Sequence, residues 1–232
     1  TETIMLHGTE LPEALSAYTP MIFTPCMPRC SYREELEKMQ LKLLKAKVRE
    51  MYEKSEFFHE RMRSVDLTPD DIVDFESFRK VPFMMKSDLR DNYPDKLFTV
   101  PYDDIVRVHV SSGTTGRPTV VGYTQNDLNN WTESLARGMT SFGMTKKDML
   151  QNFHGYGLFT GGLGVHYGAE RVGATVLPIS TGNTERQIQL MQDLPVTAWA
   201  GTPPYMFHIA DTCDRLVTPV LSWSFFLMLS DQ

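Results

Sequence analysis

Strand and helix patterns alternate along residues 105–200, and this alternation restricts the fold more than any other feature of the chain. The segment at 105–110 is rich in β-branched residues and predicts a strand, and further short strands are predicted after it. Helices are predicted between them, one of which carries apolar residues at the spacing of a helix with one buried face. Because alternating strands and helices form a mainly parallel sheet with helices on its faces, the sequence predicts an α/β fold. The predicted strands cover residues 105–110, 119–124, 148–153, 174–179 and 196–200.

The region before the predicted sheet has the pattern of a helical subdomain. Ser31 and Glu34 form a capping-box pattern at the start of an amphipathic helix of about five or six turns. Thr68, followed by proline and two aspartates, indicates a second helix start, and Ser87 with Asp88 indicates a third. We therefore expect four parts: an irregular arm at 1–30, a helical subdomain at 31–101, an incomplete α/β nucleotide- and acid-binding subdomain at 102–212, and an atypical tail at 213–232.

Two further helices are predicted within the α/β region. Thr124 and Asp127 are typical of a helix start, and the helix that follows has apolar residues on one stripe. Another capped helix is predicted from about Thr184, whereas no helix is predicted in the glycine-rich stretch at 155–173. The stripe of the first helix consists of Leu128, Trp131, Leu135, Met139 and Phe142.

The charge and composition of the chain restrict its partners. Its net charge is -6, and a protein without a basic excess cannot neutralise the phosphates of a nucleic acid, so we expect no nucleic-acid partner. A local anion site is still compatible with this charge, because backbone amides bind anions without positive side chains. The content of 41% hydrophobic and 22% charged residues is typical of a globular protein rather than a disordered one.

The three cysteines are odd in number and widely separated, which argues against a disulfide framework and favours a reducing, cytoplasmic location. Cys26 and Cys30 allow two interpretations, small loop thiols or part of a metal site. Zinc requires more ligands than this pair supplies, so we favour loop thiols. The sequence shows no signal-peptide pattern, and the apolar stretch at 216–229 is too short to span a bilayer, so no membrane partner is expected.

The loop at residues 111–119 is the segment most informative about function. Four hydroxyl residues and two glycines occupy its first six positions, directly after a predicted strand. Glycines let backbone amides converge on an anion, and hydroxyls add uncharged donors, so the loop suits the β- and γ-phosphates of ATP. A flexible hairpin turn is the alternative interpretation. The candidate phosphate-binding residues are Ser111, Ser112, Gly113, Thr114, Thr115, Gly116, Arg117 and Thr119.

The sequence SSGTTGRPT at 111–119 resembles the phosphate-binding signature of AMP-forming (adenylate-forming) acyl-CoA synthetases and their relatives. Thr119 stands where many members of this superfamily have lysine, as is usual in the phenylacetate–CoA ligase branch. The likeness to that branch extends over residues 31–212, and the chain resembles only the N-terminal half of these proteins, which is the N-terminal part of their large domain. The likeness is carried by PFMMKSDLRDNYP at 82–94, HGYGLFTGG at 154–162, HYGAERVGATVLPIS at 166–180 and GTPPYM at 201–206.

This resemblance implies an enzyme, an aryl acid–CoA ligase of aromatic acid catabolism. The carboxylate of an acid such as phenylacetate attacks the α-phosphate of ATP, and coenzyme A then displaces AMP from the acyl-adenylate to give the thioester. The loop would hold the departing pyrophosphate with preorganised donors, and Mg²⁺ is expected to share this work. In the family, the adenine-binding motif and the catalytic lysine follow the matched region, so we expect this chain to be incomplete for catalysis and name no catalytic residue.

The resemblance also implies an acid pocket. Its aromatic side chains would contact the ring of the acid. In the alternative interpretation, the glycines allow a helix and the sheet to pack closely, and the aromatic residues belong to an ordinary core. His154 stands where tyrosine is common in this branch, so it changes the shape or polarity of the pocket or acts as a base. Pro203 and Tyr205 form either a wall of the pocket or a stiff connection between a strand and a helix. The candidate residues are His154, Tyr156, Phe159, Gly161, Pro203 and Tyr205.

Other functions stay open on the sequence alone. The acid could be another aryl or a fatty acid, and the chain could be a nucleotide-binding module or a remnant without catalysis. The tail does not resemble the family, and its Trp223, Phe225 and Phe226 would favour association if exposed. A homodimer is one option that the sequence neither favours nor excludes.

Overall fold

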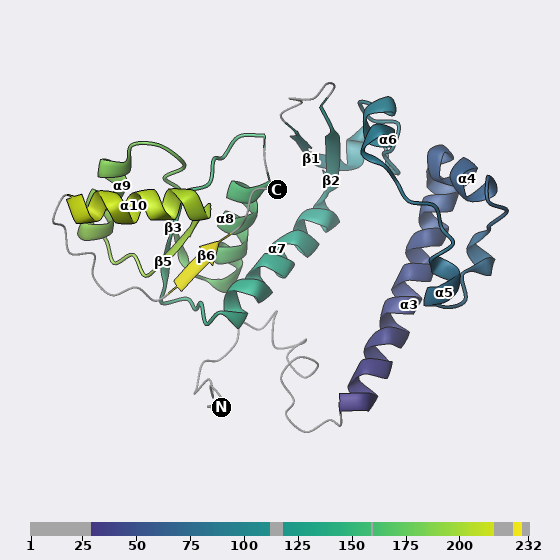
Figure 1. The fold of residues 1–232 in the computed structure, drawn as a ribbon, viewed down its shortest axis with the longest axis horizontal. Helices are drawn as coiled ribbons and strands as arrows, with labels where there is room; N and C mark the ends of the chain where they lie inside the picture. The colour runs from purple at the N-terminus through teal and green to yellow at the C-terminus, as the bar shows by residue number, and fades with distance from the viewer. Residues whose placement is uncertain (1–28, 112–117, 159, 216–224, 229–232) are drawn as a thin grey trace. The chain divides into compact units, whose positions relative to one another are not determined.

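The computed structural model describes residues 29–111, 118–158, 160–215 and 225–228 (Figure 1). The described residues divide between Gln125 and Asn126 into two compact units, a helical unit before this point and an α/β unit after it. Each unit has a hydrophobic core of its own. The change of sequence pattern at Ile105 predicted an earlier boundary, at residue 101. The division into four parts with different functions stays a prediction.

The helical unit contains the predicted helices and one hairpin. Its longest helix begins at Arg29, before Ser31, so the start predicted from the capping box at Ser31 is wrong. A small core of Val48, Met62 and Ile72 joins this helix to the next elements. The helical elements are α3 (Arg29–Lys54), α4 (Glu56–Arg63), η1 (Pro69–Asp71), α5 (Phe75–Phe78), α6 (Lys86–Asp91) and η2 (Tyr102–Asp104).

The two shorter helices predicted in this unit are present in modified form. The start predicted at Thr68 is confirmed, but it opens the short 3-10 helix η1 instead of an α-helix. The carboxylate of Asp71 accepts hydrogen bonds from the amide and the hydroxyl of Thr68, at 2.8 and 2.7 Å. The helix predicted at Ser87 and Asp88 is α6, which begins at Lys86.

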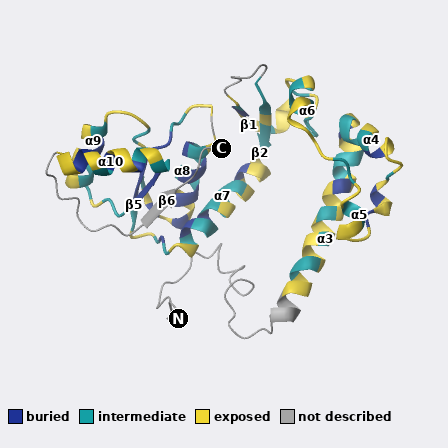
Figure 2. Cartoon of the chain, viewed as in Figure 1, coloured by how far each residue is buried: buried dark blue, intermediate teal, exposed yellow. Residues whose placement is uncertain are grey.

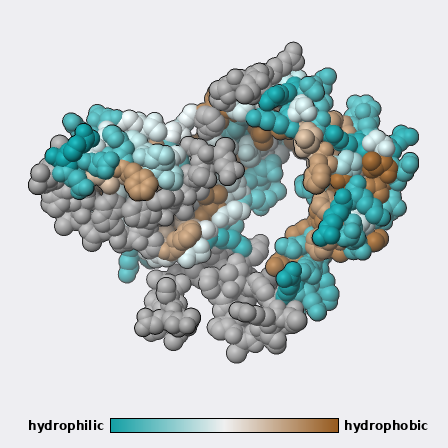
Figure 3. Space-filling model, viewed as in Figure 1, coloured by the Kyte–Doolittle hydropathy of each residue, from teal (hydrophilic) through white to brown (hydrophobic). Residues whose placement is uncertain are grey.

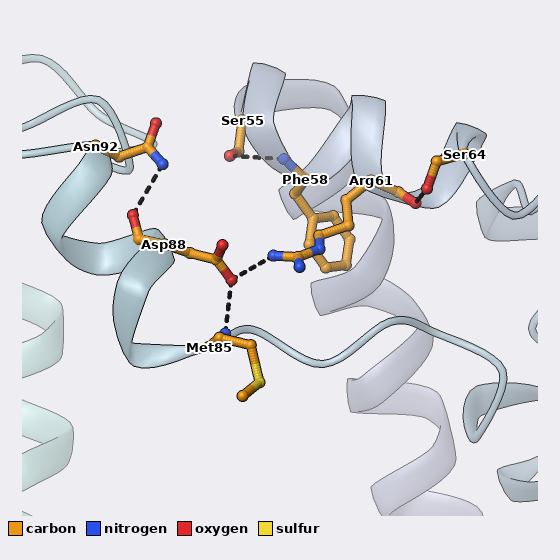
Figure 4. Close-up of polar contacts among 7 residues, drawn as sticks. All are labelled: Ser55, Phe58, Arg61, Ser64, Met85, Asp88 and Asn92. Atoms are coloured by element: carbon orange, nitrogen blue, oxygen red, sulfur yellow. Dashed lines mark hydrogen bonds and ion pairs between the residues drawn. The ribbon is translucent and has the colours of Figure 1, made fainter.

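Asp88 caps the start of α6 through one hydrogen bond and joins α6 to α4 through another (Figure 4). One oxygen of its carboxylate accepts from the backbone amide of Met85, at 2.6 Å, and from the guanidinium of Arg61. Arg61 also lies over the ring of Phe57, 5.1 Å from the ring centre. Hydrogen bonds to the charged form, first that from Met85 and then that from Arg61, lower the pKa of Asp88 below its ordinary value.

We expect this lowered pKa to make the helical unit sensitive to acid. Because the pKa of Asp88 is lower in the folded state, its stabilising effect is complete above the unfolded pKa of about 3.9 and is lost as the pH falls through the folded value. The melting temperature of the wild type should therefore fall more steeply below about pH 4 than that of Asp88→Asn, as measured by circular dichroism. Asp91→Asn, at an exposed position of α6, is the control and should keep the wild-type slope. Equal slopes for all three proteins would contradict the prediction.

The first two strands form a hairpin rather than part of the main sheet. β1 (Ile105–Val110) and β2 (Val120–Thr124) pair antiparallel, with Val110 opposite Val120. Both strands were predicted, but their inclusion in the series of parallel strands is wrong. Because the connection between them is short, only antiparallel pairing is open to them.

The α/β unit has a parallel sheet with the strand order β4-β3-β5-β6. This confirms the predicted α/β fold. Its last strand, β6, lies in the part of the chain for which we expected an atypical tail, and it pairs with β5. The strands are β3 (Met149–Asn152), β4 (Thr175–Leu177), β5 (Ala198–Gly201) and β6 (Phe225–Met228), and the helices are α7 (Gln125–Ser141), α8 (Gly161–Val172), α9 (Thr184–Asp193) and α10 (Pro203–Arg215).

Helices cover both faces of this sheet, with α7 and α8 on one side and α9 and α10 on the other (Figure 1). Alternate residues of a strand point to opposite faces, so Leu150 and Ala200 join the core beneath α7 and α8, whereas Trp199 joins the core beneath α9 and α10. Buried residues accordingly concentrate on the strands and on α8 (Figure 2). The sheet therefore holds its strand ends rigidly between two packed layers.

Helix α8 occupies the glycine-rich stretch in which the sequence predicted no helix. A β-carbon added at Gly164 would lie 2.5 Å from the ring of Trp131, and one added at Gly168 would lie 2.6 Å from the β-carbon of Leu135. These glycines therefore permit close packing, as the alternative interpretation expected, but at these two positions α8 packs against α7 and not against the sheet. The buried stripe of α7 is confirmed at Leu128 and Met139 but is wrong for Phe142, which lies beyond the end of α7 and is 61% exposed.

Apolar side chains also reach the surface of the helical unit, among mainly hydrophilic ones (Figure 3). Leu43 on α3 is 62% exposed, and Phe83 before α6 is 85% exposed. Across the part of the chain that the structure describes, none of the helices is both long and apolar enough to cross a membrane.

Candidate functional site

The candidate site lies where β3 and β5 end side by side. These neighbouring strands are parallel, with Asn152 opposite Ala200, and the amide of Phe153 extends the pairing by donating to the carbonyl of Ala200 at 2.8 Å. From β3 the chain continues through α8 to β4 on one side, and from β5 it continues through α10 to β6 on the other side. Open α/β sheets bind ligands in the crevice at such a point, where the connections from two adjacent strands diverge.

The predicted pocket residues follow these two strands. His154 and Tyr156 come directly after β3, Gly161 begins α8, and Pro203 begins α10 with Tyr205 in its first turn. Proline suits the first position of a helix, because its fixed backbone angle is helical and no amide hydrogen is needed there. Phe159, the remaining predicted residue, lies outside the described residues.

Contacts join these residues in two groups. His154 is buried, and a β-carbon added at Gly161 would lie 3.5 Å from its ring, so the absence of a side chain at Gly161 gives the imidazole its space. In the second group, the ring of Tyr205 meets the edge of Phe153, with 5.7 Å between the ring centres. The hydroxyl of Tyr205 lies 3.4 Å from that of Thr184 at the start of α9. Pro203 stays a predicted pocket residue.

Asn152 is a residue of this site that the sequence analysis missed. It is fully buried, and its side-chain amide donates to the hydroxyl of Tyr156 and to the carbonyl of Gly162, both at 2.8 Å. Its side-chain oxygen accepts from the amide of His154 at 3.1 Å. One side chain therefore fixes the turn after β3 against the start of α8. A polar residue that ends a buried strand at the divergence point was the signal that could have identified it.

Two further missed residues lie on α8 and extend this polar contact. The hydroxyl of Tyr156 lies 3.1 Å from Nδ1 of His166, and Nε2 of His166 lies 3.0 Å from the carboxylate of Glu170. His166 and Glu170 are four residues apart on the helix and therefore share one face. The rings of Tyr156 and His166 meet edge to face, with centres 5.7 Å apart.

The surroundings of Tyr156 keep its phenol protonated. Burial raises the pKa of Tyr156 above its ordinary value, and the negative charge of Glu170 adds to this effect, whereas the hydrogen bond from Asn152 opposes it. A neutral phenol keeps its hydrogen and can donate it. The hydrogen-bonded series Asn152, Tyr156, His166 and Glu170 therefore has the O–H group of Tyr156 as a donor near its centre.

The predicted phosphate loop is described only at its two ends. The amide of Ser111 donates to the carbonyl of Thr119 at 2.9 Å, and the amide of Thr119 donates to the hydroxyl of Ser111 at 2.8 Å. These bonds close the loop at its base, as the last pair of the hairpin. The hairpin is thus confirmed, and phosphate binding stays a prediction. The predicted residues outside the described residues are Ser112, Gly113, Thr114, Thr115, Gly116 and Arg117.

The described residues were compared with the side-chain groups that bind metal ions and with those of reactive thiols. Within 29–111, 118–158, 160–215 and 225–228, no group of three or more His, Cys, Asp or Glu side chains is arranged to hold a metal ion. Cys26, one half of the cysteine pair weighed above, lies outside the described residues. Cys213 is a free, buried thiol on α10, and burial raises its pKa, which lowers the share of the nucleophilic thiolate.

Comparison with known proteins identifies several relatives, although no protein-family model matches the chain. A phenylacetate–coenzyme A ligase of Pseudomonas putida is 47% identical over 182 residues, which make up 78% of this chain and 42% of that protein. The same kind of ligase from Escherichia coli (strain K12) is 46% identical over 182 residues, with the same two shares. The chain therefore spans about two fifths of the length of the curated relatives it matches.

A solved structure supports the same relationship in three dimensions. The crystal structure of 2-hydroxyisobutyryl-CoA ligase in complex with 2-HIB-AMP and CoA matches with a TM-score of 0.77 and 26% identity. The match covers 85% of this chain and 45% of that one. Sequence and fold thus agree on the relatives of this chain.

Proposed function

We propose that this chain, a homologue of the phenylacetate–coenzyme A ligases, carries the acid-binding and phosphate-binding part of an AMP-forming aryl acid–CoA ligase. The observation that carries the proposal is the position of His154, Tyr156 and Gly161, which follow β3 at the divergence point of the parallel sheet. The resemblance to the family implies an acid pocket that contains the same residues.

The proposed reaction has two steps. An oxygen of the aryl acid attacks the α-phosphorus of ATP, the bond to pyrophosphate breaks, and an acyl-adenylate forms. The thiolate of coenzyme A then attacks the acyl carbon, and AMP leaves. The loop at 111–119 holds the phosphates while charge builds on the leaving pyrophosphate, because donors fixed in advance need no reorganisation during the reaction.

The pocket after β3 selects the acid. Tyr156 and His154 offer rings against which the ring of phenylacetate packs, and burying such a ring is worth about 1.5–3 kcal/mol. This free energy favours aryl acids over small acids by about tenfold or more. Because carboxylate attack on ATP needs no general base, we assign His154 to the shape of the pocket.

Mg²⁺ is the proposed companion of ATP, because it neutralises charge on the phosphates. The described residues contain no group of three or more metal-binding side chains, so the phosphates of ATP would supply most of the ligands of the ion. The proposed place of action is the cytoplasm, which agrees with the free, buried thiol of Cys213.

The proposal is tested first by nucleotide binding. ATP titrated into the purified chain should bind weakly, and Gly116→Leu should abolish binding, because a side chain at this glycine blocks the approach of the backbone to the phosphates. Gly138→Ala in α7 is the control, since its β-carbon would meet no atom within 4 Å. Unchanged ATP affinity in Gly116→Leu would refute the assignment of the loop.

The second test concerns catalysis. Since the chain spans about two fifths of its relatives, we expect it to bind ATP without forming thioester. Phenylacetate, ATP and coenzyme A should therefore give no pyrophosphate with this chain in a coupled assay. Robust turnover would overturn this expectation, and loss of ATP binding together with association in sizing chromatography would favour a remnant without function.

A further inference from the structure

We infer that His166 and Glu170 are positioning residues, which hold the hydroxyl of Tyr156 so that the acid pocket offers an aromatic ring but no hydroxyl donor. This inference rests on the proposed function, because it specifies the selectivity of the same pocket. It depends on the direction of three hydrogen bonds and on the chemistry of the groups that make them.

The direction of each bond follows from the groups at the two ends of the chain. A carboxylate only accepts hydrogen bonds, so Glu170, 3.0 Å from Nε2 of His166, keeps the imidazole hydrogen on that nitrogen. Nδ1 of neutral His166 is then an acceptor, and Tyr156, 3.1 Å away, donates its hydroxyl hydrogen to it. At the other end, the amide of Asn152 only donates, and Tyr156 accepts from it at 2.8 Å.

The hydroxyl of Tyr156 therefore has no hydrogen left for a ligand. A phenol carries one hydrogen, and that hydrogen is directed to His166. An aryl acid can pack against the ring without leaving a buried donor unpaired, which would cost binding free energy. A hydroxylated acid finds no hydrogen-bond donor in Tyr156, so the arrangement favours apolar acyl groups.

Burial along the chain of contacts shows that these residues act through orientation. Asn152 is fully buried and Tyr156 is half-buried, whereas the side chain of Glu170 is 53% exposed. A hydrogen bond to an exposed carboxylate competes with water and contributes little to stability, so removal of Glu170 should leave the fold intact. Glu170 can therefore orient His166 without being needed for folding.

The orientation is tested without any assay of activity. Nitrogen NMR spectra of the ¹⁵N-histidine-labelled chain at neutral pH should show His166 as the tautomer with hydrogen on Nε2. Glu170→Leu should give a mixture of both tautomers, and Glu170→Gln, which keeps an acceptor oxygen, should restore the wild-type signal. Hydrogen on Nδ1 of His166 in the wild type would overturn the inference, whether or not the chain binds an acid.

The selectivity is tested by binding. The ratio of the dissociation constants for phenylacetate and 4-hydroxyphenylacetate should shift by about tenfold toward the hydroxylated acid in His166→Phe, because the Tyr156 hydroxyl is released as a donor. Adding Tyr156→Phe to this variant removes the hydroxyl and should restore the wild-type ratio. An unchanged ratio in His166→Phe, or no restoration in the double variant, would overturn the inference. Absence of binding of either acid to the wild type, with the Nε2 tautomer present, would instead refute the proposed function.

Discussion

Gly162→Ala is expected to destabilise the α/β unit by about 3 kcal/mol, at the upper end of the range for overpacking. A β-carbon at this position would lie 2.3 Å from the carbonyl oxygen of Gly155 and 3.0 Å from its carbonyl carbon. Both are backbone atoms, which cannot rotate away as the end of a side chain can. The clash exceeds the gain of about 1 kcal/mol that alanine brings to a helix interior.

The change should be measured by urea unfolding, followed by tryptophan fluorescence. Trp131 and Trp199 belong to the α/β unit, and residues 29–125 contain no tryptophan, so the signal does not report on the helical unit. Gly157→Ala is the matched control, because its β-carbon would meet no atom within 4 Å, and it should shift the midpoint very little. The same midpoint for both variants would contradict the prediction.

Phe153→Ala is expected to destabilise the same unit by about 3–5 kcal/mol. Phe153 is 1% exposed and lies where β3 ends, with the rings of Trp199 and Tyr205 at 5.9 and 5.7 Å between centres. Removing its ring leaves a cavity beneath α10 and takes away a neighbour of the predicted pocket residue Tyr205. The loss combines the transfer free energy of the ring with the cost of the cavity.

Phe207→Ala is the control for this prediction. It removes the same ring from α10 at a position that is 68% exposed, and such surface changes usually stay within about 0.5 kcal/mol. Phe153→Leu, which fills part of the space, should lie between the two. If Phe153→Ala and Phe207→Ala have equal midpoints in urea, Phe153 does not support the sheet as we argue.

These predictions bear on function because stability and site are coupled at the end of β3. Asn152, Phe153 and His154 are consecutive. Asn152 donates to the start of α8, Phe153 packs in the core beneath α10, and the ring of His154 lies next to Gly161. A variant that disturbs this segment is expected to change acid binding and unfolding together. Substitutions at His166 and Glu170, by contrast, should change selectivity with little effect on unfolding.

The sequence by itself determined the local elements and the chemical character of the site. Apolar periodicity located α7, a capping pattern located α9, and a β-branched run located β1, since each of these patterns reflects a local requirement of a helix or a strand. The order of hydroxyls and glycines at 111–119 pointed to a nucleotide-binding family, and the relatives agree with it. Each of these inferences depends only on residues close together in the chain.

The tertiary structure alone decided what depends on distant contacts. Glycines weaken an isolated helix, so α8 was missed, and it exists because Gly164 and Gly168 let it pack closely on Trp131 and Leu135. The strand order, which brings the ends of β3 and β5 together, is likewise absent from any local pattern. Asn152 gained its role only once folding placed Tyr156 and the start of α8 within hydrogen-bonding distance of it.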